Sequence, residues 1–388
     1  MRLRDIVIIV IVLTFGYVYI SCSDDKYSIS NDIEIINIDY KNITSEKLYI
    51  DEFVEDSKIL LLEANDNCLI AEISKIIIND NRIYIVDQNL KAIFLFDMNG
   101  KFLKKINAIG RAGNEYLGIT DVEIINEKLF IFDHMTGKLL SYRKDDFSFL
   151  SSQFINSIWG NNILNINDNL FFINNRSESD LGSYFIYKMK DNNDFTCYLP
   201  FSENINTWSL DQYCVKEDSC GYFYFTPFDT IYQYNDDKAF PKYFINFGKN
   251  KMPENIITND AEESLLASFK SEKIRGINKF IPLGSKLLIT YDNNKDSYFT
   301  IYEKETLKTS TYNNVLSGKY AFPLNQVSRI DQYLVSNITA NSFVFYYDNT
   351  NIDKLDSVNY RLINDIKESI TELSNPVIFF AKVVGEGK

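Results

Sequence analysis

The stretch NRIYIVDQNLKAIFLFDMNGKFLKKINAIGRAGNEY, residues 81–116, decides the fold of this chain. It contains short runs of apolar and aromatic residues, and Asn99-Gly100 between two of them is a strong signal for a tight hairpin turn. One more apolar run precedes it. The four predicted strands are Ile73–Ile78, Arg82–Asp87, Ala92–Asp97 and Lys101–Ile106. Four short strands within about 35 residues are what one propeller blade requires.

The second of these strands recurs along the chain. IYIVD at residues 83–87 is followed, at intervals of 41 to 65 residues, by five further apolar and aromatic runs. They are LFIFD at 129–133, LFFIN at 170–174, YFYFT at 222–226, LLITY at 287–291 and YLVSN at 333–337. Propeller repeats have about this spacing, whereas helical solenoids need a 3.6-residue periodicity that these runs lack. We therefore predict an all-β chain that forms a six-bladed β-propeller of four-stranded antiparallel blades.

Two segments depart from the strand pattern. Pro253–Glu272 and Arg361–Leu373 carry apolar residues at helical spacing, so we predict two short helical insertions in loops between strands. Asn375–Val384 reads as a final strand. Propellers commonly close by pairing strands from the two ends of the chain, and residues 57–63 are the predicted partner of this last strand.

Charge and composition exclude several classes of function. The formal net charge of −13, with no Lys/Arg cluster, argues against nucleic acid as a partner, because phosphate binding needs a basic patch. His134 is the single histidine of the chain, which excludes zinc sites built on several histidines and mechanisms that need two of them. With 45% hydrophobic residues, a large packed core is expected.

Several motifs together resemble the six-bladed β-propeller family of Bacteroides-type lipoproteins, a relative of the NHL-repeat propellers. They are the run from Ile83 to Ile106, the loop Gly110–Tyr116, the run Asp229–Tyr232, FINFGKNKMPE at 244–254 and NPVIFF at 375–380. The resemblance covers roughly residues 46–385. It implies a propeller fold and an exported location, and it names no ligand. The loop reads RAGNEY, without the proline that is usual in that family.

The N-terminus has the features of an export signal. Arg2 and Arg4 precede an apolar run from Ile6 to Ile20, which suits a signal peptide better than a membrane-spanning helix of about 20 residues. Ser21-Cys22 resembles a bacterial lipobox. We predict a signal peptide at 1–21, a lipidated Cys22 with a flexible tether at 22–45, and a propeller at 46–388. An uncleaved N-terminal anchor is the alternative.

The predicted location follows from these segments. Ser23-Asp24-Asp25 resembles the surface-export signal of Bacteroides-type lipoproteins. We expect an exported lipoprotein held in the outer membrane by its N-terminal lipid and displayed on the cell surface, with a periplasm-facing location as the alternative. Export also allows oxidation of cysteines. Cys214 and Cys220 flank a predicted turn, so they form either a cross-strand disulfide or two half-buried thiols.

Two groups of loop residues are candidates for binding. Arg111 and Glu115 lie in the loop that joins the first two predicted blades, where Arg111 could grip a carboxylate at the mouth of the channel. The alternative is a structural loop held by an Arg–Glu contact. Trp159 and Trp208 lie between blade-like segments and could stack on sugars or peptide side chains. Their alternative role is packing between blades.

The strand ends supply candidate carboxylates. Asp87 and Asp133 end two successive copies of the repeat, and Asn174 ends the third. A ring of such oxygens could bind Ca²⁺ in the channel. The simpler interpretation is a short acceptor side chain that caps the next turn, and its recurrence from blade to blade favours that interpretation. For His134 a surface or hydrogen-bonded role is expected. No cofactor other than this Ca²⁺ is predicted.

The sequence favours a non-catalytic binding or scaffold propeller whose partner is a peptide, a glycan or an outer-membrane protein. A propeller presents a rigid disc, and its loops choose the ligand. The alternative is a propeller lyase or hydrolase that uses channel carboxylates such as Asp87 or Asp133. The single histidine and the lack of a compact catalytic motif argue against it.

Overall fold

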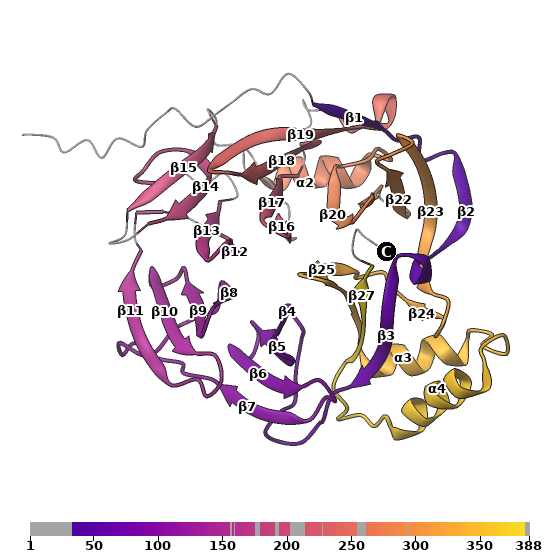
Figure 1. Cartoon of the computed structure of the whole chain (residues 1–388), viewed down its shortest axis with the longest axis horizontal. Helices are drawn as coiled ribbons and strands as arrows, with labels where there is room; N and C mark the ends of the chain where they lie inside the picture. Colours follow the sequence, from indigo (N-terminus) through magenta and orange to yellow (C-terminus); the bar gives the residue numbers. More distant parts are fainter. Residues whose placement is uncertain are drawn as a thin grey trace, which may run out of the picture.

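Six four-stranded antiparallel sheets form a ring around a central channel (Figure 1). The computed structural model describes residues 33–384 apart from residues 156, 159, 175–178, 191–193, 202–213, 227, 254–260 and 294. The predicted six-bladed β-propeller is therefore confirmed. We number the blades 1 to 6 in chain order.

The first three blades follow one another without interruption by other elements. Blade 1 consists of β4 (Lys75–Asn79), β5 (Arg82–Asp87), β6 (Ala92–Asp97) and β7 (Phe102–Ile106). Blade 2 consists of β8 (Asp121–Ile125), β9 (Lys128–Asp133), β10 (Lys138–Arg143) and β11 (Phe149–Phe154). Blade 3 consists of β12 (Asn162–Ile166), β13 (Asn169–Ile173), β14 (Tyr184–Met189) and β15 (Phe195–Pro200). In each blade the first strand lies next to the channel (Figure 1).

The other three blades each take a strand from the N-terminal part of the chain. Blade 4 consists of β16 (Cys214–Glu217), β17 (Cys220–Tyr224), β18 (Thr230–Asn235) and β19 (Lys238–Asn246). Blade 5 consists of β20 (Ile277–Leu283), β21 (Lys286–Asp292), β22 (Ser297–Glu303) and β23 (Lys308–Ser317), with the short β24 (Phe322–Pro323) paired to β23. Blade 6 consists of β25 (Ser328–Ile330), β26 (Tyr333–Ile338), β27 (Val377–Val383) and β3 (Val54–Leu61).

Three N-terminal strands run along the outside of blades 4 to 6. β1 (Glu34–Asn37) adds to β19 and β2 (Ile43–Tyr49) adds to β23, both in parallel, while β3 pairs with β27 in antiparallel register. The predicted closure by a strand within residues 57–63 is thus confirmed. However, β1 and the start of β2 lie inside the stretch 22–45 that was predicted to be a flexible tether. The apolar Ile36 is fully buried against blade 4, so the ordered chain begins before residue 46.

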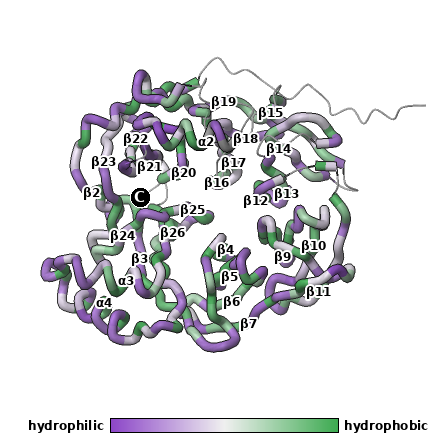
Figure 2. The backbone as a smooth tube through the Cα atoms, turned by 180° about the vertical axis from the view of Figure 1, so that it is seen from behind, coloured by the Kyte–Doolittle hydropathy of each residue, from purple (hydrophilic) through white to green (hydrophobic). Residues whose placement is uncertain are grey.

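The repeated sequence motif corresponds to the second strand of every blade. β5, β9, β13, β17, β21 and β26 contain all or most of each of the six runs, and most of the apolar side chains are buried between neighbouring blades. A strand with sheet neighbours on both sides and blades above and below has no solvent face, so it reads as an almost continuous apolar run. Figure 2 shows hydrophobic segments in the blades all round the ring.

Three α-helices decorate the ring in the described part of the chain. α2 (Ala261–Lys270) falls within the first predicted helical insertion, and α4 (Ser357–Ser369) overlaps the second but begins and ends four residues earlier. α3 (Ala340–Asp348) was not predicted, because its aromatic-rich sequence ANSFVFYYD resembles a strand. α3 and α4 form the connection between β26 and β27 and lie outside the ring (Figure 1). Two short 3₁₀ turns, η2 (Ile50–Glu52) and η4 (Gly248–Asn250), complete the elements.

The structure shows whether Cys214 and Cys220 are bridged. Cys214 lies opposite Phe223, and Cys220 lies opposite Glu217, so the two cysteines are not cross-strand partners, and both are free thiols. The disulfide interpretation of this pair is therefore wrong.

Among the described helices, none has the length and apolar character that a membrane crossing requires.

Candidate functional site

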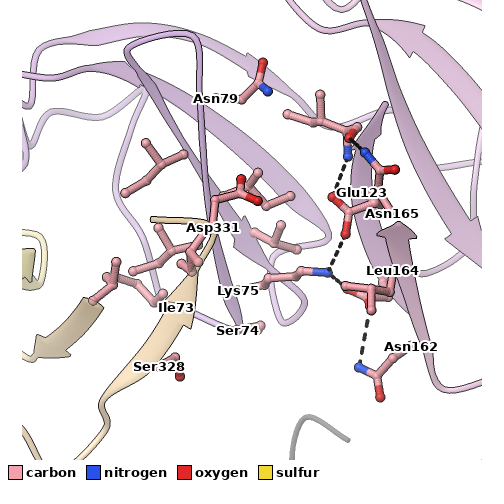
Figure 3. Close-up of a pocket in the computed structure, with 18 of the residues that line it drawn as sticks. Ile73, Ser74, Lys75, Asn79, Glu123, Asn162, Leu164, Asn165, Ser328 and Asp331 are labelled. Atoms are coloured by element: carbon pink, nitrogen blue, oxygen red, sulfur yellow. Dashed lines mark hydrogen bonds and ion pairs between the residues drawn. The ribbon is translucent and has the colours of Figure 1, made fainter. Parts of the chain in front are cut away.

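The channel at the centre of the ring is a cavity of about 1120 Å³. Side chains from all six blades line it, and nearly half come from the innermost strands β4, β8, β12, β16, β20 and β25. Figure 3 shows the part of the wall that blades 1, 2, 3 and 6 contribute. Because each blade supplies only a few of these side chains, the chemistry of the channel depends on closure of the ring.

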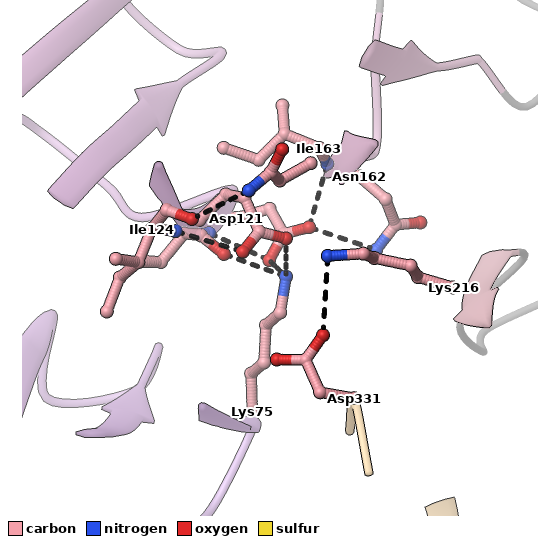
Figure 4. A network of polar contacts seen from close by, with 10 residues as sticks. Lys75, Asp121, Ile124, Asn162, Ile163, Lys216 and Asp331 are labelled. Atoms are coloured by element: carbon pink, nitrogen blue, oxygen red, sulfur yellow. Dashed lines mark hydrogen bonds and ion pairs between the residues drawn. The ribbon is translucent and has the colours of Figure 1, made fainter. Parts of the chain in front are cut away.

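A network around Lys75 ties three blades together at the channel wall (Figure 4). The Lys75 ammonium lies 2.9 Å from an oxygen of Asp121 and 3.9 Å from an oxygen of Glu123. It also donates to the carbonyl oxygen of Val122 at 2.7 Å. The other carboxylate oxygen of Asp121 accepts from the backbone N–H of Ile163 in blade 3 at 2.8 Å. Asp121 is almost fully buried, so these contacts replace the water that it loses.

Burial and charge act in opposite directions on this network. Burial lowers the pKa of Lys75, but the carboxylates of Asp121 and Glu123 outweigh it and the pKa is raised overall. Burial raises the pKa of Glu123, and Lys75 only partly offsets this. Lys75 is therefore held as a cation, while Glu123 takes up a proton more readily than an exposed glutamate.

Blades 4, 5 and 6 supply further charged groups to the same wall. Lys216 lies 3.5 Å from Asp331, and the guanidinium of Arg329 lies 2.6 Å from Glu217. Lys279 donates to the hydroxyl of Ser328 at 2.9 Å. The channel thus presents charges of both signs, and most of them are paired with each other. None of these residues was a candidate from the sequence.

The predicted channel carboxylates have a different role. Asp87 is fully buried at the end of β5 and accepts from the backbone N–H groups of Ala71, Glu72 and Leu90, at 2.7, 3.0 and 2.8 Å. These three donors belong to the loop that enters β4 and to the turn after β5. Both oxygens are used as caps for the backbone.

Asp133 repeats this arrangement in blade 2. It accepts from the backbone N–H of Leu117 at 2.8 Å and from the hydroxyl of Thr136 at 2.7 Å. Asn174 is also fully buried in the third copy and donates to the carbonyl oxygen of Tyr184. Within the described residues, no group of three or more His, Cys, Asp or Glu side chains is placed to hold a metal ion. The hydrogen bonds of Asp87 and Asp133 fit the turn-capping interpretation.

Arg111 and Glu115 lie in the loop between β7 and β8. The carboxylate of Glu115 folds back onto this loop and accepts from the backbone N–H of Ala112 at 2.8 Å. It packs so close to Gly110 that a Cβ there would lie 2.0 Å from a carboxylate oxygen. Lys138 of β10 donates to the carbonyl oxygens of Ala112 and Glu115, at 2.9 and 3.2 Å. The loop is thus held by backbone contacts.

Arg111 itself is exposed, and it is not among the residues that line the channel. Arg111 and Glu115 lie in the same loop, but no ion pair joins them in the described part of the chain. Trp159, Trp208 and Cys22 lie outside the described residues. Their predicted roles remain predictions.

His134 lies directly after the capping residue Asp133. Its backbone N–H donates to the hydroxyl of Thr120 at 2.9 Å, and its ring meets Phe132 edge-on at 6.1 Å between centroids. Burial lowers the pKa of His134, and the nearby Asp133 only partly opposes this. The histidine is therefore largely neutral at pH 7 and sits beside aromatic packing.

The sequence did contain one signal for the channel wall. Lys75 and Asp121 begin strands that are mostly apolar, and Lys216 and Arg329 lie in short strands next to apolar residues. A charged residue in such a strand is expensive to bury unless it is paired. Only the closed ring shows which residues are partners, because each partner comes from another blade.

The fold and the channel together define a class of protein, the six-bladed β-propellers. The chain belongs to the family described as a domain of unknown function, DUF4934, which matches residues 33–382. No curated protein sequence matches this chain.

Comparison with solved structures finds several similar chains. A crystal structure from Bacteroides fragilis named "Putative exported protein" superposes with a TM-score of 0.73 at 19% identity, and the match covers 90% of this chain and 99% of that one. A member of the DUF4221 family from Bacteroides vulgatus has a TM-score of 0.46 at 9% identity, covering 85% and 97% of the two chains. A virginiamycin B lyase from Staphylococcus aureus has a TM-score of 0.38 at 11% identity, covering 67% and 74%.

Proposed function

We propose that this protein is an exported, non-catalytic binding propeller that takes its ligand in the central channel. The observation that carries the proposal is the channel itself, a cavity of about 1120 Å³ whose wall comes from all six blades. Pockets of several hundred Å³ with a few converging polar groups are the usual form of ligand sites. The ligand classes that fit are those expected from the sequence, namely a peptide, a glycan or a segment of a partner protein.

The state of the carboxylates supports binding over catalysis. A general acid or base must be free to exchange a proton with the substrate. The oxygens of Asp87 and Asp133 are instead occupied by backbone and hydroxyl donors. Asp121 is likewise fixed between Lys75 and the backbone of blade 3. These groups stabilise the ring rather than offer a proton.

The alternative is a lyase or hydrolase, and one residue favours it. Glu123 lines the channel, and burial raises its pKa, which is a property of many catalytic acids. The variant Glu123→Gln separates the two functions. A binding protein retains its affinity in this variant and returns its ligand unchanged, whereas an enzyme loses turnover.

Export is part of the same proposal. The N-terminal residues have the pattern of a signal peptide followed by Cys22, and the similar protein from Bacteroides fragilis carries a name that describes export. We extend this to a lipid on Cys22, an anchor in the outer membrane and display at the cell surface. Metabolic labelling with a palmitate analogue tests the lipid, and Cys22→Ala is its control. Protease treatment of intact cells tests the display.

Binding can be tested with the full chain purified in detergent. Panels of oligosaccharides and of short peptides are screened by thermal shift, since a ligand that binds only the folded state raises the Tm. The informative variant replaces both Lys216 and Asp331 by Ser, because these half-exposed partners can be removed together without leaving a buried charge. The matched control replaces Lys367 and Asp348, an ion pair between the outer helices. Loss of the shift in the channel variant alone supports the proposal, and an equal shift in both variants contradicts it.

A further inference from the structure

A second cavity of about 580 Å³ lies beside the channel, over one edge of blade 5. Its lining comes from the start of β20, the end of β21, the start of β22, the neighbouring part of β23 and the loop that leads to β25. We call this cavity the blade 5 groove. Lys279 and Gln326 line both the groove and the channel, so the two cavities adjoin.

Carboxamides dominate the lining of the groove. They are Asn278, Asn313, Asn314, Asn325 and Gln326. Each carboxamide offers two N–H donors and one carbonyl acceptor in a plane. Asn278 donates to Asp292 at 2.6 Å, and Asn314 donates weakly to the carbonyl oxygen of Glu46 at 3.4 Å. In the described chain, no protein group hydrogen-bonds to the side chains of Asn313, Asn325 and Gln326, which leaves their donors and acceptors available to a ligand.

The groove has a rigid floor. The rings of Tyr291 and Tyr298 stack with centroids 5.6 Å apart, and the Tyr291 hydroxyl bonds to Thr300 at 2.8 Å. Asp292 at the edge of the floor is fixed by Arg275, whose Nε donates to it at 3.0 Å. A site that is already ordered loses little conformational entropy when it binds, so weak polar contacts can yield measurable affinity.

The chemistry of the lining excludes two ligand types. Lipids and apolar peptide side chains need exposed apolar surface, but Tyr291, Tyr298 and Phe299 are all buried in the floor. A strongly charged ligand needs an excess of the opposite charge. The lining instead balances Lys279 and Lys295 against Asp292 and Asp296. A neutral ligand with many hydrogen-bonding groups fits what is left.

We propose that the blade 5 groove binds a neutral oligosaccharide that extends into the channel past Lys279 and Gln326. Each hydroxyl of a sugar is both donor and acceptor, and two neighbouring hydroxyls match the donor and acceptor of one carboxamide. Three available carboxamides together with Asp296 could therefore hold two adjacent sugar units in one orientation. This inference rests on the proposed binding function and names its ligand class.

The test uses the full chain and defined trisaccharides, namely cellotriose, maltotriose, xylotriose, mannotriose and N-acetylchitotriose, by saturation-transfer NMR and calorimetry. We expect at least one to bind with a one-to-one stoichiometry. The combined variant Asn313→Ala, Asn325→Ala and Gln326→Ala should weaken that binding by about tenfold or more. Asn341→Ala, an exposed carboxamide on α3 outside the ring, is the matched control and should bind like the wild type.

Each other outcome overturns the inference. If none of the sugars binds, or if the combined variant binds as well as the wild type, the groove is not a glycan site. If short peptides bind instead and replacement of Lys216 and Asp331 weakens them, the channel function stands and only the ligand class is wrong. If neither sugars nor peptides bind, the proposed function fails with it. Thermal unfolding of each variant shows that a loss of binding is not a loss of fold.

Discussion

The ammonium group of Lys75 in blade 1 lies 2.9 Å from the carboxylate of Asp121 in blade 2. Asp121 reaches further, to the backbone N–H of Ile163 in blade 3. One buried carboxylate thus links three successive blades at the edge of the channel. Lys75 and Asp121 are far apart in the sequence and close in space, because successive blades pack against each other.

Removal of Lys75 should destabilise the ring. In Lys75→Met the methylene packing stays, but the buried Asp121 and the neighbouring Glu123 lose their cation. Breaking a buried pair in this way costs about 3 kcal/mol or more, so the free energy of unfolding in urea should fall by that amount. Lys367→Met, which breaks a more exposed pair with Asp348, should cost less than about 1 kcal/mol. Equal losses in the two variants would contradict the buried role of Lys75.

Alkaline pH should unfold the protein cooperatively. Burial raises the pKa of Tyr84, Tyr116 and Tyr198 to about 12 each, from the ordinary value of 10.0. A group whose pKa is higher in the folded state stabilises the fold fully below pH 10 and loses that contribution as the pH rises toward 12. The absorbance of tyrosinate and the circular dichroism should therefore change together in this interval. Smooth titration of all tyrosines near pH 10 in a still folded protein would show that these rings are accessible.

The fold could be predicted from the sequence because its signal is local and repeated. The second strand of each blade is buried on both sides, so it must be apolar wherever it occurs, as IYIVD and LFIFD show. The closing strand, which contains NPVIFF at 375–380, was predictable for a similar reason, because an apolar strand must pair with another strand to be buried. α3 was not predicted, because aromatic residues favour strands. In the structure, packing of this helix against the core of blade 6 prevails over that preference.

The channel could not be predicted in the same way. Lys75, Asp121, Lys216 and Asp331 are far apart in the chain, and no local pattern marks them as neighbours. Their proximity depends on the order and closure of six blades. For Asp87 and Asp133 the sequence already favoured the capping interpretation, for the opposite reason. Their regular recurrence reflects a turn that every blade must cap, and a structural requirement repeats more faithfully than a binding site.

Loss of a capping carboxylate should be costly. In Asp87→Ala three backbone N–H groups lose a fully buried acceptor, so we expect a loss of about 3 kcal/mol in the free energy of unfolding. Asp97→Ala is the matched control, because Asp97 accepts two backbone N–H groups in an exposed turn, where water can replace it. Its expected cost is about 1 kcal/mol or less. If Asp87→Ala were as mild as the control, the capping role would be wrong.

Calcium should leave the stability unchanged. The oxygens of Asp87 and Asp133 already accept hydrogen bonds, and a Ca²⁺ ion would have to displace those donors to gain its six to eight oxygen ligands. We therefore expect the same Tm in millimolar Ca²⁺ and in EDTA. A Tm that rises with Ca²⁺ and falls with EDTA, and whose rise is lost in Asp133→Ala, would restore the metal interpretation.

Truncation of the N-terminal strands should separate edge packing from ring closure. A chain that starts at Asp39 lacks β1 and the buried Ile36 and Ile38, and it keeps the buried Tyr40. Burial of an aliphatic side chain contributes about 2 kcal/mol, so this chain should fold with its stability reduced by about 4 kcal/mol. A chain that starts at Asn65 also lacks β2, η2 and β3, the outer strand of blade 6, and should show no cooperative thermal transition.

A rescue variant tests whether the loss of β3 causes this loss of cooperativity. Val54 of β3 lies opposite Val383 of β27 in antiparallel register. Residues 53–64 can therefore be moved from the N-terminus to a position after residue 384 through a short turn, which restores the strand in its place without the N-terminal connection. We expect this permuted chain to regain a cooperative transition by circular dichroism. A chain starting at Asn65 that unfolds as cooperatively as the full chain would show that blade 6 closes the ring without β3.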